Sequence, residues 1–181
     1  MKDKKIKDIM LPPSEYVVVS EDTTLEEAIK ALDEAQKNLP PGRQPHREVL
    51  VRDHNGKIVG KLGHHGFLAA LEPKYGILGN IDQLSRSGIS AESMSNMMDD
   101  LGFWEEKLEI ACKRARHIKI KEVMIPMEES IDENSSLVEA IHRMIMWQIL
   151  SIIVTRDNQV VGILRLSDIF SVIAECIKSS D

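Results

Sequence analysis

One stretch decides the fold: Val160-Val161-Gly162-Ile163-Leu164-Arg165-Leu166-Ser167-Asp168-Ile169-Phe170. It predicts a short apolar strand, a polar turn and the start of a helix. Ser167 or Asp168 can cap that helix, because either side chain can accept hydrogen bonds from the free N–H groups of the first turn. A helix N-terminus beside a carboxylate can hold a ribose and its phosphates, and it can equally be an ordinary strand-to-helix turn.

The same pattern occurs earlier in the chain as part of an ordered repeat. Four blocks of the first half match four blocks of the second half in the same order: 6–12 with 120–126, 24–29 with 136–141, 49–53 with 151–155, and 57–62 with 159–164. Each match is weak alone, but the ordered set indicates a duplicated unit.

This order of blocks resembles a tandem pair of cystathionine β-synthase (CBS) domains, over roughly residues 1–72 and 118–181. The resemblance implies an α/β (α+β) fold in which two β-α-β-β-α repeats pack as a pseudo-twofold pair, a Bateman module. The predicted domains are therefore repeat 1 (1–72), a helical insert (73–117) and repeat 2 (118–181). Such pairs commonly bind adenine nucleotides or S-adenosylmethionine between the repeats and regulate other proteins, so no enzymatic activity is expected.

Local patterns predict the elements of each repeat. In repeat 1 we expect a strand at 16–19, a helix from Thr23 or Thr24 to about Gln36, strands around 49–51 and 58–60 joined by an Asn55-Gly56 hairpin turn, and a helix at 66–71. In repeat 2 we expect a strand near 129–131, a helix from Ser135 or Ser136 to about Trp147, strands at 150–154 and 160–164, and a helix at 168–178. The apolar faces of the two first helices are predicted to be Leu25, Ala28, Ile29 and Leu32, and Leu137, Ala140, Ile141, Met144 and Ile145. Residues 1–13 are predicted to be a tail.

Residues 91–116 are predicted to form one long helix, with a kink allowed at Gly102. Apolar residues recur there at steps of three and four, as in a coiled-coil seam: Met94, Met97, Leu101, Trp104, Leu108, Ala111 and Ala115. A helix of that length is a rod of roughly 39 Å. Its seam can pack on the chain's own core, form a dimer arm or dock on another protein.

The ligand signature of the CBS family is a glycine, two apolar residues, Thr or Ser, two variable residues and an Asp. Repeat 2 keeps the carboxylate as Asp168, which the resemblance implies accepts hydrogen bonds from ribose hydroxyls. Arg165 replaces the hydroxyl residue, and it can bind phosphate or fill the pocket. In repeat 1 the matching positions are Gly63 and Gly66, so that half-site has lost its ribose anchor.

The sequence therefore predicts at most one nucleotide site, built around Asp168, for AMP, ADP, ATP or S-adenosylmethionine. The predicted contact residues are Asp168, Arg165, Ser167, Ile149, Leu150, Ser151, Ile125, Pro126 and Met127. The alternative is that Asp168 is only a helix cap. The loop at 38–45, which carries Arg43 and is followed by His46 and Arg47, is either solvated or in contact with phosphate or a partner.

Composition limits the remaining functions. The net charge is −6 with no long basic run, which argues against nucleic-acid binding. Cys112 and Cys176 form no CxxC pair, which fits a reducing, cytoplasmic environment, and no stretch approaches the roughly 20 apolar residues of a membrane span. His64 and His65 are adjacent and have no ligand partner at helical spacing, so no metal is predicted.

Two functions follow from these features. The first is a regulatory module that binds an adenosyl ligand, forms a homodimer and acts on an unknown effector protein. The second is a ligand-free dimerisation or interaction scaffold that uses the long insert helix. An enzyme is not predicted, because no nucleophile–base pair, metal set, phosphate loop or paired carboxylates can be assigned from the spacing.

Overall fold

The structure is a computed structural model that describes residues 4–41, 44–76, 88–103, 105–127 and 130–179. In repeat 1 the elements are η1 (Ile6–Asp8), η2 (Pro13–Glu15), β1 (Val18–Ser20), α1 (Leu25–Lys37), β2 (Glu48–Arg52), β3 (Ile58–Gly63), α2 (His64–Ala69) and η3 (Pro73–Gly76). The insert contains α4 (Ala91–Asp100) and α5 (Leu108–Ala115). In repeat 2 they are η4 (Ile120–Glu122), β4 (Ile125–Pro126), β5 (Ser130–Asp132), α6 (Leu137–Trp147), β6 (Ser151–Arg156), β7 (Gln159–Arg165) and α7 (Leu166–Ser179).

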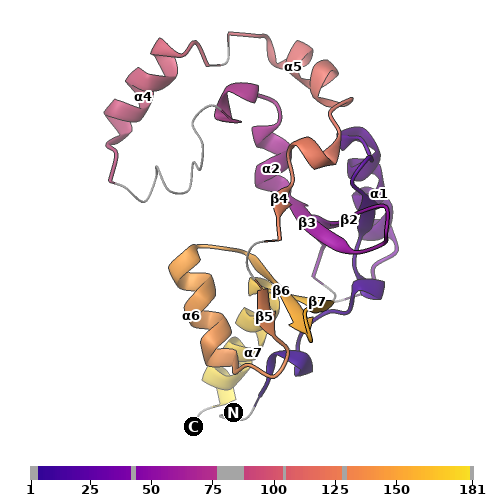
Figure 1. The fold of residues 1–181 in the computed structure, drawn as a ribbon. Coiled ribbons are helices and arrows are strands. Elements are labelled where there is room, and N and C mark those ends of the chain that lie inside the picture. The colour runs from indigo at the N-terminus through magenta and orange to yellow at the C-terminus, as the bar shows by residue number, and fades with distance from the viewer. Residues whose placement is uncertain (1–3, 42–43, 77–87, 104, 128–129, 180–181) are drawn as a thin grey trace.

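The two repeats form the predicted α/β pair, with a sheet in each (Figure 1). In both sheets the first strand pairs parallel with the second, and the second pairs antiparallel with the third. Helices cover the outer face of each sheet, and the inner faces meet in a shared apolar cluster of Leu11, Tyr16, Leu50, Ile58, Ile153 and Ile163. The order of layers is therefore helix, sheet, sheet, helix.

Local capping starts the first helix of each repeat where the sequence predicts. The Thr24 hydroxyl accepts from the Glu27 backbone N–H, and the Glu27 carboxylate accepts from the Thr24 N–H, which together form a capping box. Ser136 accepts from the Glu139 N–H at the equivalent position. The crossing segments complete both starts, because the Leu25 N–H donates to the Ile118 carbonyl and the Leu137 N–H donates to the Lys4 carbonyl.

The predicted tail at 1–13 is wrong for the described residues 4–13, because this segment contributes to the core of repeat 2. Ile6 is fully buried there, and its N–H donates to the Ser135 carbonyl. In the same way Ile120 is fully buried in the core of repeat 1, and its N–H donates to the Thr23 carbonyl. The segment with which each repeat begins in the sequence thus packs in the core of the other repeat. The chain crosses between the halves twice.

The structure aligns β2 of repeat 1 with β6 of repeat 2 one residue away from the alignment that the sequence repeat predicts. Val51 pairs with Gly60 and Val154 pairs with Gly162, so Val51 is equivalent to Val154 rather than to Ile153.

Of the two hairpin turns, Asp157-Asn158 has both residues at positive φ, as a type I′ turn requires. At the predicted Asn55-Gly56 turn only Gly56 has positive φ.

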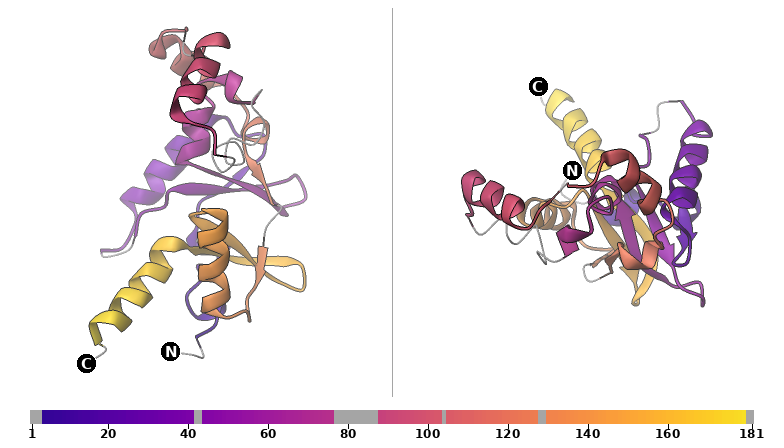
Figure 2. Two further views of the ribbon diagram at one scale, coloured as in Figure 1. Left: turned by 90° about the vertical axis from the view of Figure 1, so that its left-hand side faces the viewer. Right: turned by 90° about the horizontal axis from the view of Figure 1, so that it is seen from above.

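The predicted long helix is wrong, because the insert contains two helices, α4 and α5. Gly102 has φ of 63°, a left-handed conformation that ends α4. Ala111 and Ala115 of the predicted seam are buried, whereas Leu108 is 59% exposed, so only part of α5 packs on repeat 1. Trp104 lies outside the described residues. In Figures 1 and 2, α4 lies away from both sheets.

Three further apolar residues are more exposed than predicted. Ile29 on α1, Ile145 on α6 and Leu150 before β6 face away from their cores. Among the described residues, no helix is long and apolar enough to span a bilayer.

Candidate ligand-binding site

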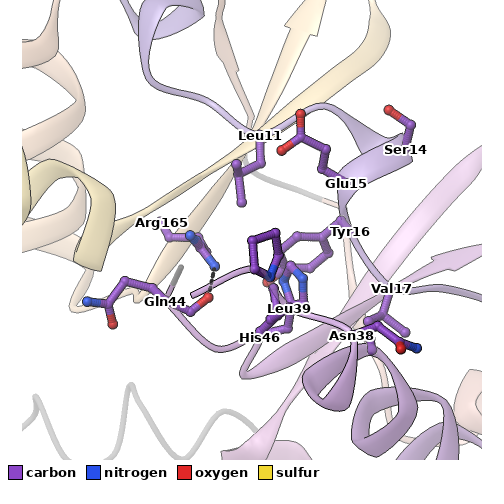
Figure 3. Close-up of a pocket in the computed structure, with 12 residues that line it drawn as sticks. Leu11, Ser14, Glu15, Tyr16, Val17, Asn38, Leu39, Gln44, His46 and Arg165 are labelled. Atoms are coloured by element: carbon purple, nitrogen blue, oxygen red, sulfur yellow. Dashed lines mark hydrogen bonds between the residues drawn. The ribbon is translucent and has the colours of Figure 1, made fainter. Parts of the chain in front are cut away.

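A cavity of about 480 Å³ lies between the two repeats (Figure 3). This volume falls within the range of small-molecule sites. Its walls come from the segment that leads into β1, from the end of α1 and the loop after it, and from the end of β7. The lining residues are Leu11, Ser14, Glu15, Tyr16, Val17, Ala35, Asn38, Leu39, Pro40, Gln44, His46 and Arg165.

The first wall is held in place by the chain crossing. Leu11 and Ile163 exchange backbone hydrogen bonds of 2.9 Å in both directions. This bridge fixes the segment from Leu11 to Val17 beside β7, which ends two residues later at Arg165. Residues from opposite ends of the sequence therefore meet at one cavity.

Arg165 is a fixed cation at one end of the cavity. Its Nε donates to Asp168 Oδ2 at 2.6 Å, its Nη2 donates to Asp168 Oδ1 at 2.7 Å, and its Nη1 donates to the Gln44 carbonyl at 3.2 Å. The residue is only 7% exposed. Burial lowers the pKa of Arg165, but the hydrogen bonds and charge of Asp168 outweigh burial and leave that pKa raised. The guanidinium is therefore charged and oriented before any ligand arrives.

Tyr16 and His46 provide an aromatic surface inside the same cavity. Their rings meet edge to face with centroids 4.7 Å apart. The Tyr16 hydroxyl donates to Glu48 Oε1 at 3.0 Å. Burial, followed by the charge of Glu48, raises the pKa of Tyr16 far above its ordinary value, so the phenol stays neutral. A planar ring can stack in such surroundings.

A second polar group crosses the interface between the sheets. Lys61 Nζ donates to the carbonyl and to the hydroxyl of Ser151, each at 2.6 Å, and lies 4.0 Å from Glu48 Oε2. Lys61 occupies the position in β3 that Ile163 occupies in β7, because Gly60 and Gly162 are equivalent. This group ties the two repeats together where the apolar cluster would otherwise continue.

Several of the predicted site residues come together, but not as expected. Arg165 lines the cavity, whereas Asp168 and Ser167 do not. The helix α7 starts at Leu166, so Ser167 and Asp168 lie inside its first turn and not at the cap. The Ser151 hydroxyl accepts a hydrogen bond from Lys61 Nζ. The Leu150 carbonyl accepts from the Leu166 N–H, and the Ile149 side chain packs on the core of repeat 2.

The structure places the predicted wall of Ile125, Pro126 and Met127 elsewhere. Ile125 pairs with Lys61 and Pro126 pairs with Gly60 of β3, and the Met127 N–H donates to the Val59 carbonyl. These residues lie beside repeat 1 because their segment crosses over. The segment from Leu11 to Tyr16 takes the corresponding place beside Arg165.

The loop after α1 lines the cavity, whereas the sequence predicted either a solvated loop or a contact with phosphate or a partner and did not join it to the Asp168 site. It runs from the end of α1 at Lys37 to the start of β2 at Glu48, whereas the equivalent connection in repeat 2 runs only from Trp147 to Ser151. Gln36 Nε2 donates to the His46 carbonyl at 2.9 Å and anchors the loop. The difference in length between these two connections is the sequence feature that distinguishes this loop. Arg43 lies outside the described residues.

The remaining candidate residues lie outside the cavity. Arg47, His64 and His65 are exposed and do not line it. Within the part of the chain that the structure describes, no group of three or more His, Cys, Asp and Glu residues is placed to hold a metal ion.

Comparison with known proteins gives one family match. The sequence profile of the CBS domain matches residues 6–72 and 120–175. No curated protein sequence gives a significant match.

Solved structures with the same fold are numerous. The CBS domain of a CBS domain containing membrane protein from Sphaerobacter thermophilus is 24% identical, with a TM-score of 0.60 over 94% of this chain and 88% of that chain. CBSX2 in complex with AMP is 16% identical, with a TM-score of 0.59 over 96% and 98% of the two chains. A putative acetoin utilization protein (AcuB) from Vibrio cholerae is 17% identical, with a TM-score of 0.60 over 97% and 93%. At these identities the likeness establishes a shared fold.

Proposed function

The chain belongs to the CBS domain family, and we propose that it is a regulatory CBS pair that binds an adenine nucleotide or related adenosyl ligand between its repeats. The observation that carries the proposal is the cavity of about 480 Å³, to which both repeats contribute and which ends at the buried Arg165. An AMP complex of a protein with the same fold supports the choice of ligand.

A ligand in this cavity contacts both repeats at once. Its binding therefore favours one relative arrangement of the repeats over others, which is the way in which a ligand can change a protein's state. CBS domain proteins are generally regulatory rather than catalytic. The effect of the ligand would be passed to a separate effector protein.

Thermal unfolding with AMP, ADP, ATP and S-adenosylmethionine tests this function. A ligand at about 100 times its Kd adds roughly 2.7 kcal/mol of stability, which for a chain of this size is a shift of roughly 5–10 °C in Tm. In Ala35→Trp a large ring enters the cavity from α1 and should abolish the shift.

The matched control is Glu34→Trp, which changes the neighbouring exposed residue of α1 outside the cavity. It should keep the shift. No shift with any of the four ligands, in a wild-type protein that unfolds cooperatively, would contradict the proposed function.

A second candidate, a ligand-free scaffold, is favoured by exposed apolar side chains on the two helices of repeat 2. Ile145 and Met146 on α6 and Phe170 and Ile177 on α7 are each at least 60% exposed. Such residues mark association surfaces, and we propose that the chain forms a homodimer through them. Sedimentation velocity should show a dimer that Phe170→Glu converts to a monomer. A dimer without any ligand response favours the scaffold.

A further inference from the structure

Arg165 lines the cavity and is ion-paired with Asp168. The guanidinium lines the cavity, whereas the Asp168 carboxylate does not. Both carboxylate oxygens already accept from Arg165 at 2.6 and 2.7 Å. The cavity therefore presents a cation at the position where a ribose acceptor was expected. A ligand that reaches this end meets hydrogen-bond donors and not a carboxylate.

The guanidinium has donors left for a ligand. Nε and one N–H of Nη2 bind Asp168, and one N–H of Nη1 binds the Gln44 carbonyl. One N–H on each Nη atom is then left without an acceptor among the described residues. A guanidinium with donors on both Nη atoms matches the spacing of phosphate oxygens.

Resting on the proposed function, we propose that Arg165 is the specificity-determining residue of this site, and that Asp168 is a positioning residue for Arg165 and does not anchor the ribose. The ligand class is an adenine nucleotide whose phosphate lies against the guanidinium. Neutral adenosine lacks the group that Arg165 binds. S-adenosylmethionine has no phosphate, and its methionine carboxylate is its one anionic group.

The two ends of the cavity differ in chemistry. The guanidinium of Arg165 lies at one end, beside the uncharged Gln44, whose carbonyl accepts from it. The rings of Tyr16 and His46, which meet edge to face, also line the cavity. The phosphate is therefore expected at the Arg165 end and the base toward Tyr16 and His46.

Calorimetric titration of AMP and of adenosine separates the two roles of Asp168. Wild type should bind AMP at least about tenfold more tightly than adenosine. In Asp168→Asn, a lost positioning contact lets the guanidinium turn, so AMP affinity falls while adenosine affinity stays within about threefold. If Asp168 anchored the ribose, both affinities would fall by the same factor, and that result would overturn the proposal.

Arg165→Ser should remove the preference for AMP and keep adenosine binding. Removing the cation alone leaves the partly buried Asp168 carboxylate unpaired, which can destabilise the chain. The double variant Arg165→Ser with Asp168→Ser removes both charges and should show the same loss of preference. The matched control is Arg156→Ser, because Arg156 forms a two-bond ion pair with Glu133 in the same repeat but outside the cavity; its preference should not change.

The outcomes distinguish this inference from the proposed function. Adenosine binding within threefold of AMP in wild type, or an unchanged preference in the Arg165 variants, overturns the role of Arg165 alone. Failure of wild type and all variants to bind AMP, adenosine or S-adenosylmethionine overturns the proposed function and this inference together.

Discussion

Ile6 and Ile120 occupy equivalent positions in the two sequence repeats, and each is completely buried in the core of the repeat that it does not precede. Ile6 packs among the residues of α6, β6 and α7, and Ile120 packs among those of α1, β2 and β3. The two halves are therefore joined by exchanged apolar side chains as well as by the contact between their sheets. Neither half completes its core from its own contiguous sequence.

The exchange predicts a long-range effect of a substitution near the N-terminus. Ile6→Ala should lower the free energy of unfolding by about 2–5 kcal/mol, because it leaves a cavity in the core of repeat 2. Hydrogen exchange should accelerate first in α6 and β6, far away in sequence. Chemical denaturation with exchange mapping measures both. Ile29→Ala, at an isoleucine that is 47% exposed, is the control and should cost far less. Acceleration confined to residues near Ile6 in sequence would contradict the exchange.

The glycines of the repeated Val-Gly pairs predict a second effect. A Cβ at Gly162 would lie 2.7 Å from the Leu11 carbonyl oxygen, and a Cβ at Gly60 would lie 2.7 Å from that of Ile125. The absence of a side chain at each glycine therefore leaves room for the backbone of the segment that crosses over from the other half of the chain. Gly162→Ala or Gly60→Ala should cost about 1–3 kcal/mol of stability, because a backbone group must move. Gly76→Ala, where a Cβ meets open space, should be close to neutral in the same denaturation experiment.

Tyr16 predicts a loss of stability at alkaline pH. Its pKa in the folded state is raised by burial and by Glu48, whereas in the unfolded chain it lies near 10. The folded state therefore holds this proton more tightly. The contribution is fully present below about pH 10 and is lost as the pH rises further. Above that pH the free energy of unfolding should fall by about 1.4 kcal/mol per pH unit more steeply in wild type than in Tyr16→Phe. Parallel curves from denaturation at pH 8 to 11.5 would show that Tyr16 ionises freely in the folded protein.

Glu26 predicts an acid-sensitive contact between α1 and the insert. Hydrogen bonds from Lys30 and from Arg116 lower the pKa of Glu26 to about 2. Because this pKa is depressed, its contribution to stability is present above about pH 4.5 and is lost as the pH falls toward 2. The decrease in Tm between pH 4.5 and 2 should be smaller in Arg116→Gln than in wild type, because this substitution removes the cationic partner of Glu26 that directly follows α5. An unchanged fall in calorimetric scans would show that the contact adds nothing.

The sequence was sufficient where structure is local. Thr24 and Ser136, each one of the two caps that the sequence allowed for its helix, accept from Glu27 and Glu139, which are only three residues away. The spacing of Arg165 and Asp168 brought both residues to one strand–helix junction. The ion pair between Arg165 and Asp168 could not be predicted, because the family signature assigns each of these positions a contact with the ligand and not a contact with the other residue.

The walls of the cavity depended on long-range pairing. The repeat pattern does not reveal that 6–12 and 120–126 exchange places, so Ile125 and Pro126 were expected beside Asp168, whereas they pair with β3. The loop from Asn38 to His46 has no counterpart in repeat 2, so its predicted alternatives, a solvated loop or a contact with phosphate or a partner, did not place it beside Arg165. Both differences concern which segments meet, which hydrophobic periodicity does not report.

Hydrogen exchange with and without AMP is the most direct measurement of the central claim, since it identifies which half-site the nucleotide occupies. Slower exchange is predicted in the segment from Leu11 to Val17, at the end of α1 and in its loop, and around Arg165. Protection of Ile125 to Met127 and of the end of β3 instead, or no protection at saturating AMP, would contradict the account.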